Sequence, residues 1–272
     1  MTDLQKKEYE LLKIFIEICE AFDLRYYLVC GSALGAIKYK GFVPWDDDVD
    51  VALLRPDYEK FLEKAPSMLP DWVFLQNYRT DPEYPGMGSK LRNRNTTFIE
   101  QEASKIRMNH GVFIDVFPLD GYPEGEKEQE KFEKEKWKHY RKRYTGLIPF
   151  YHKDLGLTIR SALRRFLGIY TPTAKACKAA EELMMSNDVM KSKIWCNFAN
   201  SMRKSEYFPR EVYAEGAEAE FEGMKVRVPK QYHTYLTQKY GDYSEDPPKE
   251  KQVASHGQTV DLERPYTDYL KF

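Results

Sequence analysis

The sequence has no excess of positive charge, no long apolar run and no leader-like start. Its 272 residues carry 42 Lys and Arg against 43 Asp and Glu, whereas proteins that bind duplex nucleic acid usually have a basic excess or a basic face. No stretch approaches the ~18 apolar residues needed to cross a bilayer, and the first residues lack the apolar core and cleavage site of a signal peptide. We therefore expect a cytoplasmic protein with no nucleic-acid partner.

Cysteine is scarce and unpaired in this sequence. None of the four cysteines belongs to a CxxC motif or stands at metal-ligand spacing from a histidine, so the sequence offers no zinc-site pattern. Cys19 falls inside an apolar helical pattern and Cys30 ends an apolar strand-like run, and we expect both to be buried thiols. The other two are Cys177 and Cys196.

What is present argues for a well-packed core. Hydrophobic residues make up 42% of the chain and aromatic residues 14%, with 20 Tyr and 15 Phe. This apolar surface has to be buried, which excludes disorder over most of the length. A chain of this size can form one large domain or two small ones.

The first 65 residues read as helix, strand, short helix, strand and helix. Apolar residues recur at helical spacing over residues 3–22, and Thr2 suits an N-cap. Strand-like runs follow at 26–30 and 51–54, with a short helix predicted at 32–39 between them, and Pro56 fits the first turn of the third helix.

The rest of the chain, after residue 65, alternates between segments with strand-like and with helical sequence patterns. Short strands are predicted up to residue 117, where Pro118 should end the last of them. A densely charged surface helix, further helices, a hairpin around Gly223 and a final helix ending at Gly241 should follow. The predicted ranges are 72–76, 87–93, 96–100 and 112–117 for strands, and 126–144, 155–168, 173–200 and 231–240 for helices.

An aspartate run, DDDVD at residues 46–50, is the strongest functional signal. On a strand, Asp46, Asp48 and Asp50 share one face while Asp47 points to the other. Carboxylates crowded on one face repel one another, and a divalent cation resolves that conflict. A solvated acidic turn after Pro44 is the alternative reading.

Three further features favour a metal site over an acidic turn. The aspartates start a very apolar run, which implies burial beside a core strand. Gly31 and Ser32 follow the preceding strand and open a short helix, whose N-terminus can bind phosphate. A lone Asp115 stands in the apolar strand VFIDVF, where a charge is costly unless it is paired or ligates a metal. This order of parts is the layout of a nucleotidyltransferase-type site.

Positive charge should face the same pocket, because phosphoryl transfer depends on positioning and charge stabilisation. Lys90 and Arg92 stand two apart on a predicted strand and therefore on one face. They are our candidates for phosphate binding, with a solvated strand edge as the alternative.

The sequence resembles the LicD family of phosphotransferases, to which the fukutin-related proteins are distantly similar. Its signature resembles residues 31–61, GSALGAIKYKGFVPWDDDVDVALLRPDYEKF, and its next two blocks resemble SKLRNRNTTFIE at 89–100 and GVFIDVFPLDGYP at 111–123. A C-terminal block resembles residues 221–248. The likeness covers about residues 5–123 and 219–257 and leaves 126–200 unassigned.

The resemblance implies an α+β, nucleotidyltransferase-like fold with a mixed sheet and flanking helices. We expect a catalytic core at 1–123, a mainly helical insertion at 124–205, and a strand–hairpin and helix unit at 206–272 that completes the site. The resemblance further implies that Asp48, Asp50 and Asp115 are catalytic residues and ligands of Mg²⁺ or Mn²⁺, with Asp115 acting as third ligand or as base. Asp46 is a further candidate metal ligand at the edge of the site. Gly31 and Ser32 would hold phosphate.

The activity that the resemblance implies is transfer of a phospho-alcohol from a CDP-activated donor to a glycan or its lipid-linked precursor. CDP-choline is the favoured donor, and the product released would be CMP. A nucleotidyltransferase acting on a small molecule and releasing pyrophosphate is the alternative, because residues alone do not say which phosphorus is attacked.

Several residues near the motifs remain candidates for substrate contacts. Trp45, Tyr84 and Tyr122 could recognise a quaternary ammonium through cation–π contact, or could pack in the core. His256 could contact phosphate or lie in a surface loop. The basic amphipathic segment 155–170 could lie on the inner face of an anionic membrane or face the protein core.

Overall fold

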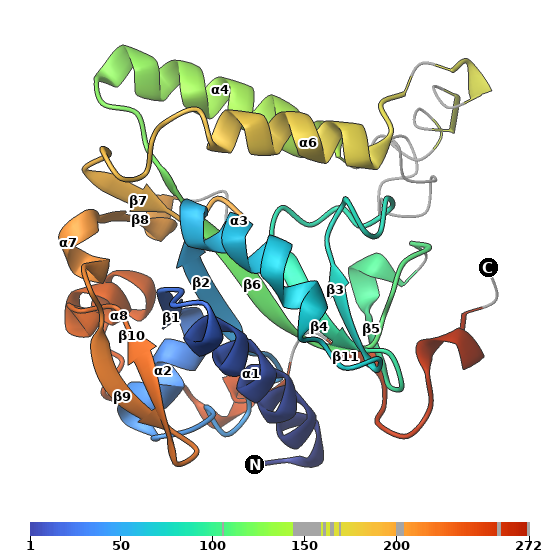
Figure 1. Ribbon diagram of the computed structural model, residues 1–272, viewed down its shortest axis with the longest axis vertical. Coiled ribbons are helices and arrows are strands. Elements are labelled where there is room, and N and C mark those ends of the chain that lie inside the picture. The colour runs from blue at the N-terminus through green and yellow to red at the C-terminus, as the bar shows by residue number, and fades with distance from the viewer. Residues whose placement is uncertain are drawn as a thin grey trace.

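The computed structural model shows an α+β protein built around one mixed sheet (Figure 1). The structure describes residues 1–104, 106–143, 159, 162–163, 166–168, 170–199, 204–254 and 257–270. Within these residues no helix is long and apolar enough to cross a membrane.

The seven-stranded sheet runs in the order β1-β2-β6-β4-β3, and β7 and β8 extend it beside β6. Strands β2 and β6 are parallel, and every other pairing in this sheet is antiparallel. The strands are β1 (Tyr26–Leu28), β2 (Asp50–Leu54), β3 (Val73–Gln76), β4 (Ser89–Asn93), β6 (Val112–Gly121), β7 (Ile194–Cys196) and β8 (Tyr207–Pro209).

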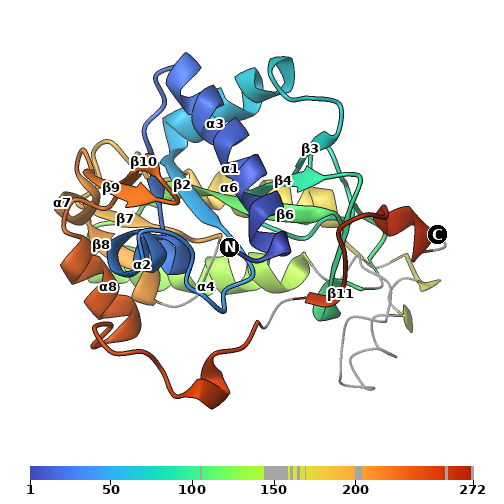
Figure 2. The same cartoon turned by 90° about the horizontal axis from the view of Figure 1, so that it is seen from below.

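Helices α1 (Asp3–Ala21) and α3 (Arg55–Lys64) cover one face of this sheet (Figures 1 and 2). Helix α1 begins with a capping box between Thr2 and Gln5, as the sequence predicts for the N-cap. Its apolar face, which includes Leu11 and Phe15, packs into the main core. Alternation along β6 sends Ile114 and Val116 into the same core and leaves Asp115 on the opposite face.

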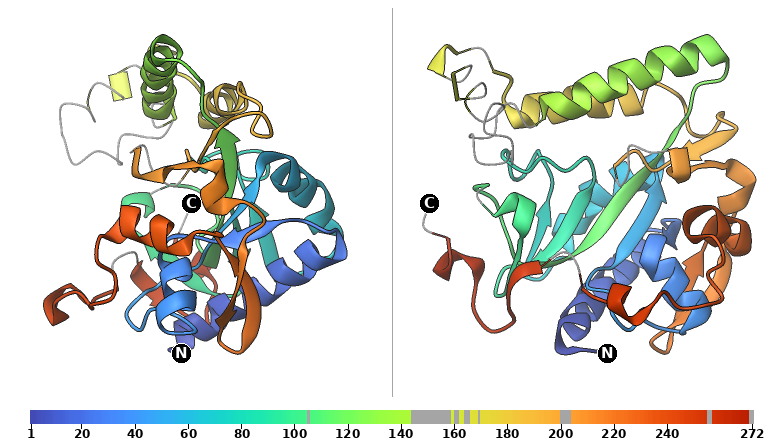
Figure 3. Two further views of the ribbon diagram at one scale, coloured as in Figure 1. Left: turned by 90° about the vertical axis from the view of Figure 1, so that its left-hand side faces the viewer. Right: turned by 180° about the vertical axis from the view of Figure 1, so that it is seen from behind.

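Helices α4 (Glu126–Lys142) and α6 (Thr173–Met184) pack side by side along one edge of the molecule (Figures 1 and 3). A buried ionic network ties α6 to the core: the Arg55 guanidinium donates two hydrogen bonds to Asp120, both 2.7 Å, and one of 3.2 Å to Glu181 on α6. The charged helix α4 is therefore not fully solvated, since its Phe132 is buried against the α6 side.

The C-terminal part brings a hairpin and a helix against the start of the chain. Helix α2 (Cys30–Lys38) contacts both β9 of the hairpin and helix α8. The hairpin turns at Glu222 and Gly223, both with positive φ, and α8 ends at Gly241 with φ 72°. The remaining elements are α7 (Arg210–Tyr213), β9 (Ala217–Phe221), β10 (Met224–Val228), α8 (Tyr232–Tyr240) and β11 (Gly257–Asp261), which pairs with β5 (Thr97–Glu100).

Two expectations about elements are corrected. Pro118 does not end its strand: β6 continues to Gly121. The Asp115 N–H donates to the Val49 carbonyl on the β2 side, and backbone N–H groups alternate sides along a strand, so the nitrogen of Pro118 points toward the β4 side. Strand β4 extends along β6 only as far as Ser89, which pairs with Val116. No β4 hydrogen bond is therefore lost at Pro118. The predicted helix 173–200 ends at Met184, and the residues beyond it include the short strand β7.

Candidate metal and nucleotide site

Asp48, Asp50 and Asp115 come together where β2 and β6 begin to pair. Asp50 is the first residue of β2, and its register partner on the parallel strand β6 is Asp115. Each of the three offers a carboxylate oxygen, and these oxygens lie within 4.8 Å of one another. Within the described residues, no other group of three His, Cys, Asp or Glu side chains meets this geometry.

The three carboxylates suit a divalent cation because their own charges are unfavourable there. Burial raises the pKa of Asp50 well above its usual range, and the charges of Asp48 and Asp115 raise it further. Burial also raises the pKa of Asp115, while the neighbouring Lys90 ammonium lowers it. An all-oxygen set of carboxylates is what Mg²⁺ and Mn²⁺ prefer. The donor set therefore fits such an ion.

The N-terminus of α2 points into the same cleft as the aspartates. Cys30, its first residue, has a φ of 50°, a left-handed conformation that is strained for a residue with a side chain. A Cβ on Gly31 would lie 2.2 Å from Asp46 Oδ2, so only glycine lets the Asp46 carboxylate come this close. The Ser32 hydroxyl accepts the Asp50 backbone N–H at 2.8 Å and fixes the start of β2.

Lys90 and Arg92 share one face, as predicted, but their charges are engaged by protein groups. Lys90 Nζ lies 3.1 Å from Asp115 Oδ2 and 3.8 Å from Glu100 Oε1. Arg92 is 0% exposed and donates hydrogen bonds to Gln76, the Gly111 carbonyl and Glu100. Lys90 thus orients Asp115, and Arg92 holds the surrounding strands rather than opening onto solvent.

A cleft of about 720 Å³ lies beside the aspartates. Asp46, Asp48 and Asp50 line it together with Cys30 and Gly31 at the start of α2. Helix α8 and the residues around it contribute a wall, in the 206–272 unit expected to complete the site, but the sequence interpretation named none of the residues of this wall. That wall includes Glu206, Lys239, Tyr240, Asp242, Tyr243, Glu245 and Asp246.

Lys239 is the basic group nearest to the start of α2. Its ammonium pairs with Glu206 and lies 3.3 Å from Cys30 Sγ. The Cys30 thiol in turn donates to the Asp50 carboxylate, which lowers the pKa of that group against the larger effect of burial. The chain Glu206–Lys239–Cys30–Asp50 therefore links the C-terminal part of the protein to the metal site. Its sequence signal was present, since Lys239 falls in the C-terminal block of the resemblance.

Only one of the three predicted aromatic contacts lines this cleft. Trp45 does, whereas Tyr84 is buried with Ile106 and Met108, and Tyr122 packs against Phe132 and Phe198 in a separate cluster. Both tyrosines are buried, as the core-packing alternative has it. The Asp115 charge still reaches the Tyr84 hydroxyl and, after burial, raises its pKa. The aromatic residues that join Trp45 in the cleft are Tyr39, Tyr240 and Tyr243.

Of the aspartate run only Asp50 lies on a strand, and the loop before it still places Asp46 and Asp47 on different sides. Asp46 lines the cleft, while Asp47 is buried away from it and accepts the Gly257 N–H at 3.4 Å. Glu8 on α1 also feels the aspartate run: burial raises its pKa well above the usual range, and the charge of Asp48 raises it further. His256 lies outside the described residues, as do Arg160, Arg164 and Arg165 of the basic segment 155–170.

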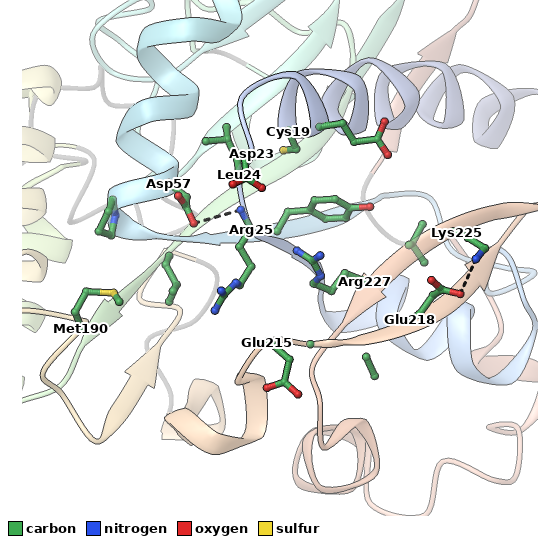
Figure 4. Close-up of a pocket in the computed structure, with 17 residues that line it drawn as sticks. Cys19, Asp23, Leu24, Arg25, Asp57, Met190, Glu215, Glu218, Lys225 and Arg227 are labelled. Carbon is green, nitrogen blue, oxygen red and sulfur yellow. Dashed lines mark hydrogen bonds and ion pairs between the residues drawn. The ribbon is translucent and has the colours of Figure 1, made fainter.

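A larger cleft, of about 830 Å³, lies elsewhere on the molecule, between the end of α1, β1 and the β9–β10 hairpin (Figure 4). Its walls mix charges of both signs, including Arg25, Arg227, Asp57 and Glu215. None of the three clustered aspartates lines it. Cleft size alone therefore does not identify the site, and the carboxylate cluster does.

Comparisons with known proteins agree with this geometry. Residues 23–155 match the family profile described as "LicD/FKTN/FKRP, nucleotidyltransferase domain". The chain is 27% identical over 262 residues, 90% of its length, to the lipopolysaccharide cholinephosphotransferase LicD of Haemophilus influenzae, 92% of which is covered. Shorter similarities, 31% over 58 residues and 33% over 49, link it to uncharacterized proteins of Rickettsia typhi and Rickettsia prowazekii, covering 19% and 18% of them. These matches support a phosphotransferase of the LicD family, with residues 23–155 matching the family's nucleotidyltransferase domain.

Proposed function

We propose that the protein transfers phosphocholine from CDP-choline to a cell-surface glycan or its lipid-linked precursor and releases CMP, in a reaction that requires Mg²⁺ or Mn²⁺. The cluster of Asp48, Asp50 and Asp115 beside the N-terminus of α2 is the observation that carries this proposal. The similarity to a lipopolysaccharide cholinephosphotransferase over most of both chains supports phosphocholine as the transferred group.

Asp48, Asp50 and Asp115 would hold the metal ion. When bound, such an ion supplies Lewis-acid stabilisation of charge on the bridging and leaving oxygens of the diphosphate. Lys90, paired with Asp115 at 3.1 Å, orients that carboxylate and opposes the rise in its pKa that burial causes. The Ser32 hydroxyl and the Cys30 thiol hold Asp50 from its backbone and its carboxylate, respectively.

The chain's own groups would position the donor. No side chain at the N-cap position, Val29, caps α2, and the Cys30 N–H donates to the Tyr235 hydroxyl at 3.0 Å. The N–H groups that follow at Gly31 and Ser32 suit a diphosphate oxygen, as helix N-termini commonly do. Lys239 adds positive charge at the same end of the cleft. Held in this way, the phosphorus that bears choline is the one attacked by an acceptor hydroxyl, and CMP is the leaving group.

Product analysis tests the proposal directly. Purified protein incubated with CDP-choline, Mg²⁺ and a lipid-linked or free glycan acceptor should release CMP, and Asp48→Ala and Asp50→Ala should lower that rate by at least about a hundredfold. Asp71→Ala, which removes an exposed aspartate far from the cluster, is the matched control. CMP release by the cluster variants at the wild-type rate would disprove the metal-site assignment. Release of pyrophosphate from a nucleoside triphosphate, as its nucleotidyl group passes to a small-molecule acceptor, would favour the nucleotidyltransferase alternative.

A further inference from the structure

The cleft beside the aspartates continues into a part whose lining is aromatic and acidic. We call this part the aromatic–acidic end and define it by Tyr39, Trp45 and Tyr243 together with Asp242, Glu245 and Asp246. Tyr240 also lines the cleft but lies nearer the aspartates, since the charges of Cys30 and Asp50, after burial, raise the pKa of its hydroxyl. It opens off the same cleft that Asp48 and Asp50 line, so a ligand can reach from one to the other.

Two segments far apart in the sequence build this end. Tyr39 and Trp45 follow α2, with ring centroids 6.2 Å apart in an edge-to-face arrangement. Tyr243 follows α8, and its hydroxyl lies 3.0 Å from His233 Nδ1 on the same helix. The Tyr39 hydroxyl donates to Asp246 and so joins the two segments. The rings are therefore held in place by contacts with one another, with Asp246 in the cleft wall and with His233 outside it.

The charge of this end is negative. Across the whole cleft, two lysines line the walls with seven carboxylates, Asp46, Asp48, Asp50, Glu206, Asp242, Glu245 and Asp246. Both lysines are already paired, Lys38 with Asp246 and Lys239 with Glu206. Asp242 and Glu245 thus give the aromatic–acidic end a net negative field, which repels phosphate and attracts a cation.

We propose that the aromatic–acidic end binds the quaternary ammonium of the donor's choline moiety and selects a cationic alcohol over an uncharged polyol. A quaternary ammonium has no hydrogen to donate, so it is recognised by ring faces and diffuse negative charge rather than by directed hydrogen bonds. The hydroxyls of a polyol would instead need several fixed donors and acceptors to replace water. This inference rests on the proposed function and names the alcohol subsite of the same cleft.

Binding of two ligands that differ only in the choline moiety tests the subsite. Calorimetry with Mg²⁺ should give wild-type protein about tenfold higher affinity for CDP-choline than for CDP. Trp45→Leu and Tyr243→Leu should each bring the ratio of the two affinities close to one without changing the affinity for CDP. Tyr243→Phe, which keeps the ring, should preserve the ratio.

Matched controls come from exposed aromatic residues outside the cleft. Tyr232, 38% exposed on α8, and Trp137, 43% exposed on α4, do not line it. Tyr232→Leu and Trp137→Leu should therefore keep the wild-type ratio. A wild-type ratio of one, or a ratio unchanged in Trp45→Leu and Tyr243→Leu, overturns the subsite.

The subsite and the proposed function fail in different ways. If the protein releases CMP from CDP-choline but the ratio of its affinities for CDP-choline and CDP is the same in Trp45→Leu and Tyr243→Leu as in the wild type, the proposed function stands and the subsite is rejected. A choline-dependent ratio that those variants abolish, with no CMP released from CDP-choline in the presence of acceptor, would keep the subsite and reject the function.

Discussion

Asp50 and Asp115 are register partners on the parallel strands β2 and β6, so their side chains leave the same face of the sheet as neighbours. Asp48 joins them from the preceding loop, and the three carboxylates lie within 4.8 Å. Without a cation their mutual repulsion and their burial oppose folding. The same carboxylates that would bind a divalent ion therefore lower the stability of the metal-free protein.

Removing one of these charges should stabilise the metal-free protein. In EDTA, Asp50→Asn should raise the melting temperature by about 2–4 °C, which corresponds to ~1 kcal/mol for a chain of this size. Asp115→Asn should gain less, because it also removes the ion-pair partner of the buried Lys90. Mg²⁺ should raise the melting temperature of the wild type and leave both variants unchanged. Asp71→Asn serves as the surface control, with the wild-type response to Mg²⁺. Lower stability of both cluster variants in EDTA would contradict the account.

The same pKa shifts make metal binding depend on pH. The folded-state pKa of both Asp50 and Asp115 lies above the unfolded value, so the metal-free native state binds more protons than the unfolded state and loses stability as pH rises through that interval. A cation must displace those protons, so its apparent affinity should rise with pH over the same interval. Mn²⁺ titrations at about pH 5 and about pH 8, in buffers of different ionisation enthalpy, should show weaker binding and proton release at the lower pH. Equal Mn²⁺ affinity at the two pH values would disprove this pH dependence.

The metal cluster could be predicted because its signals are local. Alternation along a strand assigned Asp48 and Asp50 to one face and Asp47 to the other, and the cost of a charge in an apolar strand singled out Asp115. Their convergence follows from β2 and β6 being parallel neighbours. Whether they bind metal stays a prediction, as does the division at residues 123 and 205. The seven-stranded sheet draws strands from all three predicted units.

The remainder of the cleft could not be predicted because it depends on packing between distant segments. Nothing local in the sequence says that α8 will pack on α2, yet that contact brings Lys239 and Tyr243 to the cleft. Arg92 shows the converse. Its spacing from Lys90 places it on the site's face, but only the fold reveals that Gln76, Gly111 and Glu100 take up its guanidinium.

Gly31 should be needed because of Asp46 rather than because of its backbone. A Cβ at Gly31 would lie 2.2 Å from Asp46 Oδ2, and Gly31 has no positive φ. Gly31→Ala should therefore displace the Asp46 carboxylate and lower CMP release from CDP-choline by about tenfold or more. In an Asp46→Ala background the same substitution should cost little further activity or thermal stability. A loss of equal size in both backgrounds would show that the methyl group meets something other than Asp46.

Lys239 and Glu206 should behave as a buried ion pair, since their side chains are only 9% and 4% exposed. Lys239→Met leaves the Glu206 carboxylate buried without its partner and should cost about 3–5 kcal/mol in urea unfolding. Lys239→Met combined with Glu206→Gln should lose clearly less, because neither charge remains. Lys225→Met, at the exposed Lys225–Glu218 pair on the hairpin, should leave the unfolding midpoint unchanged.

The two Lys239 variants also separate folding from the metal site. Because Lys239 contacts the Cys30 sulfur, whose thiol donates to Asp50, the double variant should recover stability while its Mn²⁺ affinity remains below that of the wild type. Cys30→Ser, which keeps a donor to the Asp50 carboxylate, should bind Mn²⁺ more tightly than Cys30→Ala. Wild-type Mn²⁺ affinity in the double variant, together with equal affinities in the two Cys30 variants, would mean that the Glu206–Lys239–Cys30 chain supports the fold alone and does not position Asp50.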